Sequence, residues 1–470
     1  MHSPSPQTEC VVSGTLCLML RMSQVAGVAP LSFRRTAAGW SVRVSRVANF
    51  YGNTLSFTLW FLSTLTIAID IVIEPERSYR TRTNSTRIVW VADVATVGLV
   101  VCTAACTGLM RMKSLMVYLL ELQEARIVWV AEVATVGLVV CTAACTGLMR
   151  MKSLMVYLLE LQEINLKLSL YREEPSNESC RKLIVVSSMI FTCSTILLDY
   201  GLFIYQVVIY HGKVLTSCLY IFYNISSAVQ QVILLTFFEI ATSVLTSLQT
   251  LNNCLKDLLQ EIMNNSPEGK RAMITLESRI DMYNIKNKSI NSVVDTMSVY
   301  RGQPITRPKS IPTTIRRLAM LYCSLCDVIR QVNDSHGTIL VALLLCLLLH
   351  LVITPYHVIT NIFNKSRSDR SSPLLQINWV VLHFGNLLLI IEPCHRTHDE
   401  MEMTRHLVSQ MMRYARSEDS DLVMELQMFY QHLVLNEVSY APLKMFSLNR
   451  TLITTILGSI TTYLVVIVQL

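Results

Sequence analysis

The chain has 470 residues, of which 52% are hydrophobic and only 16% are charged. A soluble domain is about 25% charged, so this chain lacks the charge that a water-facing surface requires. The composition predicts one polytopic membrane protein rather than several soluble domains. The net charge of +7 would suit a nucleic-acid partner. However, the basic residues lie between apolar runs, as in the cytoplasmic loops of membrane proteins, so we expect no nucleic acid.

The N-terminal region contains an apolar stretch over residues 11–20. No basic segment precedes it, and Glu9 stands where a signal peptide would carry positive charge. We therefore interpret the stretch as a cytoplasmic helix that leads into the first membrane span.

The remaining chain contains eight apolar runs near the length of about 20 residues that a spanning helix needs. They cover residues 49–73, 88–110, 127–149, 183–210, 215–245, 337–360, 374–391 and 452–470.

Two of these runs belong to one sequence written twice. Residues 87–124 and 126–163 differ only at Asp93 against Glu132. Structural repeats diverge until only their pattern remains, so near-identity indicates a recent tandem duplication. Counting the pair once predicts an all-α, seven-transmembrane helix bundle formed by a single domain over residues 1–470. The repeated unit is a span followed by a helical stalk, residues 153–161 in the second copy.

Basic residues predict the orientation of this bundle. With a cytoplasmic N-terminus, 29 of the 40 Lys and Arg fall in the segments assigned inside, and 8 fall in the loops assigned outside. This asymmetry follows the positive-inside rule and places the C-terminus outside the cell. The basic segment over residues 246–336 is expected to extend the helices into the cytoplasm.

Cysteine and catalytic motifs add little. Cys323 and Cys326 form a CxxC pair, but no second Cys or His pair follows at the spacing of a zinc site. We expect this pair to pack within a helix, and we expect neither a metal nor a cofactor. The sequence contains no nucleophile elbow, P-loop or HExxH pattern, so an enzyme is not expected.

Polar residues within the apolar runs are candidate functional groups, because such groups are costly in a bilayer. Gln376, Trp379 and His383 share one helix face by their spacing. An aromatic face beside amide and imidazole groups suits a sugar, whose C–H face stacks while its hydroxyls need donors and acceptors. The alternative is that these groups only bond neighbouring helices. The further ligand-binding candidates are Asp199, Gln231, Glu239, Thr354 and Tyr356. For Asp199 we expect a water-filled cavity rather than an ion pair.

Four sequence stretches resemble a known family. TYLVVIVQL over residues 462–470 resembles the TYhhhhhQF signature of insect gustatory receptors, where h is apolar. EPCH over 392–395, LNRT over 448–451 and NDSH over 333–336 agree with the fructose-receptor branch. GVAP over 27–30 is a weaker match.

The resemblance implies fold and function together. Gustatory receptors are seven-helix proteins that assemble as homotetramers around a pore lined by the seventh helix, and they act as ligand-gated, non-selective cation channels. Carried over, Tyr463 would line the pore, Gln469 would sit at the gate, and Leu470 would replace the gating Phe. Gln376 and Trp379 would line the sugar pocket. The expected location is the plasma membrane of gustatory dendrites.

The resemblance leaves rival functions open. A receptor for bitter plant compounds would need a larger apolar pocket. A non-conducting member would fit the duplication and the replacement of the final Phe by Leu470. A secondary transporter would need discontinuous helices and paired internal repeats.

Overall fold

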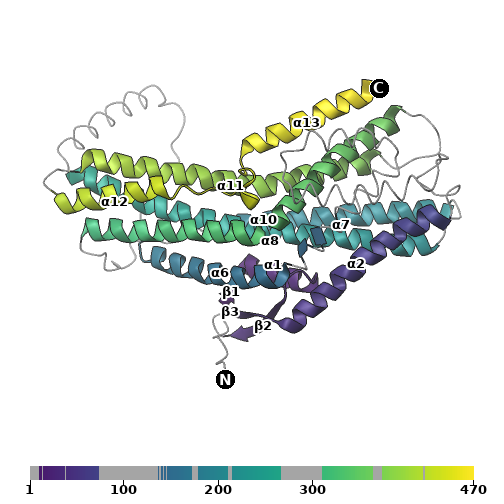
Figure 1. Ribbon diagram of the computed structural model, residues 1–470, viewed down its shortest axis with the longest axis horizontal. Helices are drawn as coiled ribbons and strands as arrows, with labels where there is room; N and C mark the ends of the chain where they lie inside the picture. Colours follow the sequence, from purple (N-terminus) through teal and green to yellow (C-terminus); the bar gives the residue numbers. More distant parts are fainter. Residues whose placement is uncertain are drawn as a thin grey trace, which may run out of the picture.

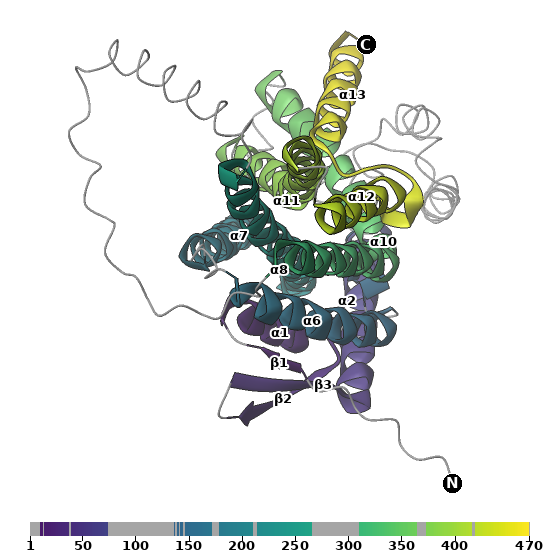
Figure 2. The same ribbon diagram turned by 90° about the vertical axis from the view of Figure 1, so that its left-hand side faces the viewer.

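The computed structural model describes residues 10–73, 136–171, 178–209, 214–265, 310–363, 373–415 and 419–469, with gaps at 13, 37–38 and between 136 and 146. Long helices run side by side through the molecule, and a small sheet lies at one side (Figure 1). Viewed end on, the sheet and helix α13 lie on opposite sides of the central helices (Figure 2). Much of the apolar core forms where three of these helices, α8, α10 and α11, pack together.

The N-terminal region contains a helix that overlaps the one predicted over residues 11–20, and it also contains three strands that were not predicted. It forms β1 (Cys10–Val12), α1 (Gly14–Val25), β2 (Leu31–Thr36) and β3 (Gly39–Val44). The strands form an antiparallel sheet in the order β1-β3-β2. The all-α prediction was therefore wrong here, and two of the three strands, β2 and β3, lie between α1 and the first apolar helix.

The strands form because β2 and β3 alternate polar and apolar side chains. Val42 on β3 is fully buried and pairs with Cys10 on one side and Phe33 on the other. The Arg21 guanidinium of α1 lies 3.6 Å from the centre of the Trp40 ring, in cation–π geometry. This contact fixes α1 against the sheet.

The helices correspond to most of the predicted spans but are longer. Their bounds are α2 (Arg46–Ile73), α6 (Gly147–Ser169), α7 (Glu178–Ile209), α8 (Val214–Asn265), α10 (Ile311–Phe363), α11 (Pro373–Tyr414), α12 (Ser420–Leu435) and α13 (Arg450–Gln469). A short 3-10 helix, η2 (Pro442–Lys444), separates α12 from α13. The 52 residues of α8 span about 78 Å, well beyond a bilayer core of about 30 Å.

Four of the described helices are long and apolar enough to cross a membrane by length and composition: α7, α8, α10 and α11. The apolar stretch of α7 is only 17% buried, whereas the apolar stretches of α8 and α10 are 89% and 94% buried. The predicted span over 88–110 lies outside the described residues. The second copy of the duplicated segment is described from residue 136, and its predicted stalk is confirmed as part of α6.

Several α6 side chains belong to the core. Met151, Leu154, Met155 and Tyr157 are buried in the cluster that also contains α8 and α10 residues. The second copy of the repeat therefore supplies a packed helix. Cys326 of the CxxC pair is likewise buried in α10. Among the described residues, no group of His, Cys, Asp and Glu is arranged to hold a metal ion.

Candidate functional site

A pair of buried amides joins α8 to α11. Gln231 Nε2 donates to Asn386 Oδ1 at 3.0 Å, and Asn386 Nδ2 donates back to Gln231 Oε1 at 2.8 Å. The same Gln231 nitrogen also donates to Ser188 Oγ of α7 at 2.9 Å. Gln231 and Asn386 are only 2% and 6% exposed. Three helices therefore meet at one polar contact inside an apolar region.

A second polar contact lies beside the first and joins α8 to α10. Gln230 Nε2 lies 3.5 Å from Cys346 Sγ, and His350 Nδ1 lies 2.7 Å from the Cys346 carbonyl oxygen. A carbonyl oxygen only accepts, so His350 Nδ1 carries the proton. In the neutral ring, Nε2 is then an acceptor.

Three aromatic rings connect these groups to α11. The His350 and His383 rings lie 4.4 Å apart, and the Trp379 and His383 rings are stacked with centroids 5.5 Å apart and planes 19° apart. His383 Nδ1 is buried and has no hydrogen-bond partner among the described residues. The site therefore offers an imidazole nitrogen and an indole face between two helices. We call Gln230, Gln231, His350, Trp379, His383 and Asn386 the polar layer.

The structure brings some predicted ligand residues together and separates others. Trp379, His383 and Gln231 belong to the polar layer. Gln376 lies one turn before Trp379 on α11, and Thr354 lies one turn beyond His350 on α10, where it is buried. These five groups come from three neighbouring helices.

Asp199 and Glu239 lie further away. Asp199 is partly buried on α7, eleven residues or about 16 Å along the helix from Ser188. Glu239 is buried on α8, about 12 Å along the helix from Gln231. The Tyr356 side chain lies outside the described residues.

The predicted gate lies at the end of α13. Gln469 ends that helix, while the side chains of Tyr463 and Gln469, and all of Leu470, lie outside the described residues. The exposed face of α13 includes Leu457 and Val465. Its assignment as a pore lining stays a prediction.

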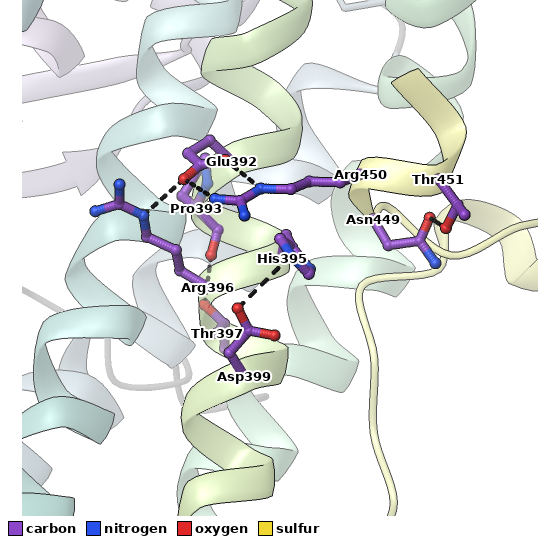
Figure 3. A network of polar contacts seen from close by, with 9 residues as sticks. All are labelled: Glu392, Pro393, His395, Arg396, Thr397, Asp399, Asn449, Arg450 and Thr451. Atoms are coloured by element: carbon purple, nitrogen blue, oxygen red, sulfur yellow. Dashed lines mark hydrogen bonds and ion pairs between the residues drawn. The ribbon is translucent and has the colours of Figure 1, made fainter. Parts of the chain in front are cut away.

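A charged junction ties the beginning of α13 to α11 (Figure 3). Arg450 Nη2 donates to Glu392 Oε1 at 2.7 Å, and Arg450 Nε donates to Glu392 Oε2 at 3.2 Å. Arg396 Nε donates to Glu392 Oε1 at 2.8 Å. The bond to Glu392 raises the pKa of Arg450. A carboxylate held by a guanidinium fork has a defined orientation as well as an opposite charge.

Pro393 follows the bridging carboxylate on the same helix. Proline has no N–H to donate to the carbonyl four residues earlier, so α11 lacks one internal bond at this turn. The Pro393 carbonyl accepts from Thr397 Oγ1 at 2.7 Å. The junction therefore combines a strong side-chain contact with a weakened helix turn.

Sequence reasoning missed part of this arrangement. Asn386 was not identified, although it continues the face of Trp379 and His383 at helical spacing. Glu392 and Arg450 were each seen within motifs, but their pairing spans 58 positions and leaves no local signal.

The architecture and the sequence together identify the family of this chain. Long apolar helices packed around buried polar groups define a polytopic helical membrane protein. The sequence profile of the family described as 7tm Chemosensory receptor matches residues 72–470. The chain therefore belongs to the 7tm chemosensory receptor family, a family of receptors rather than enzymes.

Individual relatives are more distant. The chain is 25% identical over 194 residues to "Gustatory receptor for sugar taste 43a" of Drosophila melanogaster, covering 39% of this chain and 44% of that protein. It is 24% identical over 194 residues to "Putative gustatory receptor 28b" of the same species, covering 40% and 39% respectively. The matches thus span less than half the length of these relatives.

The fold resembles solved insect receptors. The olfactory receptor OR5 from Machilis hrabei in complex with eugenol has a TM-score of 0.54 at 9% identity, covering 97% of both chains. The same receptor described without eugenol has a TM-score of 0.52 at 10% identity, again covering 97% of both. At this identity the likeness concerns the fold alone.

Proposed function

We propose that this chain is a gustatory receptor that acts as a ligand-gated, non-selective cation channel, opened by a sugar such as fructose. The observation that carries the proposal is the polar layer, where an indole face, two imidazoles and three amides lie between α8, α10 and α11. A sugar needs an apolar ring face and paired donors and acceptors. Similarity to a relative named for sugar taste supports the same class of ligand.

The route from ligand to pore runs along α11. This helix carries Trp379 and His383 in the polar layer and, about 13 Å further along, Glu392 in the junction with Arg450 of α13. A ligand shifts a conformational equilibrium only by binding one state better than the other. In the proposed mechanism, the sugar favours the position of α11 at which α13 opens the pore.

The proposed assembly is a homotetramer in the plasma membrane of gustatory dendrites. Closed rotational symmetry gives one central pore, with α13 of each subunit lining it and Gln469 and Leu470 at the gate. The long extensions of α8, α10 and α11 beyond the apolar runs would hold the subunits together in the cytoplasm. An N-terminus inside and a C-terminus outside complete this topology.

The direct test is expression in cells without sugar responses, with current recorded under sugars and bitter compounds at matched osmolarity. A saturable inward cation current to fructose or a similar sugar is expected. Currents to bitter compounds alone would favour the bitter-receptor alternative. A surface-expressed protein without current would favour a non-conducting member.

A further inference from the structure

A small cavity lies apart from the polar layer, between α1, α6, α8 and α10. Its lining includes Ser23, Arg150, Thr236 and His336, and the rest is apolar. The cavity is narrow and sits in the buried core. Three of these four residues come from helices of the main bundle, so a ligand here would touch several elements at once.

Arg150 is the charged group of this cavity. Its side chain is 4% exposed. Nη2 donates to the Val28 carbonyl oxygen at 2.9 Å, while Nε and Nη1 are buried without a hydrogen-bond partner among the described residues. Burial lowers the pKa of Arg150 to about 10, so the guanidinium is still a cation at neutral pH.

No counter-charge compensates this cation within the described part of the chain. None of the ion pairs found there includes Arg150. An uncompensated buried charge is strongly unfavourable. A water molecule accepts hydrogen bonds but does not neutralise charge, so the electrostatics favour an anion.

The remaining polar groups restrict the kind of anion. Thr236 Oγ1 donates to the Val232 carbonyl, so in its 2.9 Å contact with Ser23 the Ser23 hydroxyl is the donor. Both hydroxyl protons are therefore used. The Ser335 hydroxyl donates to the Val332 carbonyl oxygen. In the 2.9 Å contact between His336 Nδ1 and Ser335 Oγ, the imidazole N–H is therefore the donor, and Nε2 is left as an acceptor. Few donors and a narrow space suit a monatomic anion better than phosphate or sulfate.

We propose that this cavity binds one halide-sized anion, chloride under physiological conditions, through the Nε–H and Nη1–H groups of Arg150. Arg150 donates a hydrogen bond to Val28, which belongs to the GVAP segment (27–30). His336 is the last residue of the NDSH segment (333–336). The anion thus joins two motifs that the sugar and pore proposals leave without a role.

Thermal unfolding of the full chain in detergent tests this site. Sodium gluconate is replaced stepwise by sodium chloride, so that the ionic strength and the sodium concentration stay constant. The melting temperature is expected to rise saturably with chloride, bromide is expected to replace it, and sulfate and gluconate are not. Absence of any chloride dependence in the unmodified protein would overturn the proposal.

Variants assign the effect to the cavity. Arg150→Met is expected to abolish the chloride dependence, and Arg150→Lys to shift its midpoint several-fold upward because the planar fork is lost. Lys152→Met on the same helix, where the side chain is exposed, is the matched control and keeps the dependence. Ile339→Phe fills the cavity while leaving Arg150 intact, so it tests the site even where Arg150→Met does not fold. An unchanged chloride response in Arg150→Met or in Ile339→Phe contradicts the assignment.

Discussion

Arg450 at the start of α13 donates two hydrogen bonds to the Glu392 carboxylate of α11, from Nη2 at 2.7 Å and from Nε at 3.2 Å. The pair joins the helix assigned to the pore with the helix that carries Trp379 and His383. Glu392 also accepts from Arg396 of its own helix, so its carboxylate is fixed from two sides. In the proposed mechanism, this junction passes movement of α11 to α13.

Charge reversal tests the junction. Glu392→Arg places three guanidinium groups together, and Arg450→Glu places two carboxylates together. Each variant is expected to shift the sugar dose-response several-fold or to lower the maximal current. The double variant restores the attraction between positions 392 and 450 and is expected to recover much of the loss. Recovery is incomplete because Arg396 then faces a cation.

The control for this experiment is an ion pair confined to one helix. Arg405 Nη1 lies 2.9 Å from Glu402 Oε1, and both side chains belong to α11. Glu402→Gln removes that pair without altering the junction and is expected to leave the dose-response unchanged. A double variant no better than the worse single variant would contradict direct coupling between Glu392 and Arg450.

The amide pair between α8 and α11 yields a stability prediction. Gln231→Leu leaves the buried Asn386 amide unsatisfied, which costs about 1–3 kcal/mol of unfolding free energy. Asn386→Leu leaves the Gln231 side-chain carbonyl oxygen without its partner, and we expect a loss of similar size. In the double variant neither amide remains, so the loss is expected to be smaller than the sum of the two. Denaturation in detergent measures all three, and Gln427→Leu on the exposed face of α12 is expected to change little. Strict additivity would show that the pair does not act as a unit.

Much of the helical framework was predictable because apolar runs of spanning length leave few alternatives. Extension of the helices into the segment 246–336 was also expected, but the exact helix ends were not: α8 continues to Asn265 and α10 begins at Ile311, because amphipathic extensions carry no hydropathy signal. The small sheet was missed since β1 has three residues, β2 and β3 have six each, and alternation over so few positions is weak evidence.

The candidate site was predictable only in part. Helical spacing placed Trp379 and His383 on one face, and their stacking is consistent with that prediction. The partners across helices, such as Cys346 for Gln230 and Val28 for Arg150, depend on tertiary packing. A single sequence holds no record of such pairings.

Trp379 provides the test of ligand recognition. Trp379→Ala removes the aromatic face that is proposed to stack on the sugar ring, and we expect the half-maximal sugar concentration to rise about tenfold or more, in line with losses at buried aromatic contacts. Trp379→Phe keeps an aromatic face and is expected to have a smaller effect. Patch-clamp dose-responses measure both, with surface labelling to correct for expression. Val381→Ala, an exposed position on the same helix, is the control. An unmoved dose-response in Trp379→Ala excludes this residue from the ligand site.

The duplicated segment raises the question of which copy the fold requires. The structure describes α6 from the second copy, where Arg150 and Tyr157 are buried. Their counterparts 39 positions earlier are Arg111 and Tyr118, and the two copies are identical except at Asp93 and Glu132. Either copy therefore carries the side chains that the α6 position needs.

Two deletions test this equivalence. Removal of 87–125 keeps the second copy, and removal of 125–163 keeps the first. The resulting chains differ from each other only by Asp or Glu at one position, so both are expected to reach the surface and to give similar currents. Removal of 87–163 deletes both copies and is expected to abolish surface expression, because α6 contributes Leu154, Met155 and Leu158 to the core and loss of such burial costs several kcal/mol. Surface biotinylation and current density measure the three variants side by side. Loss of expression in both single deletions would show that the two copies have separate structural roles.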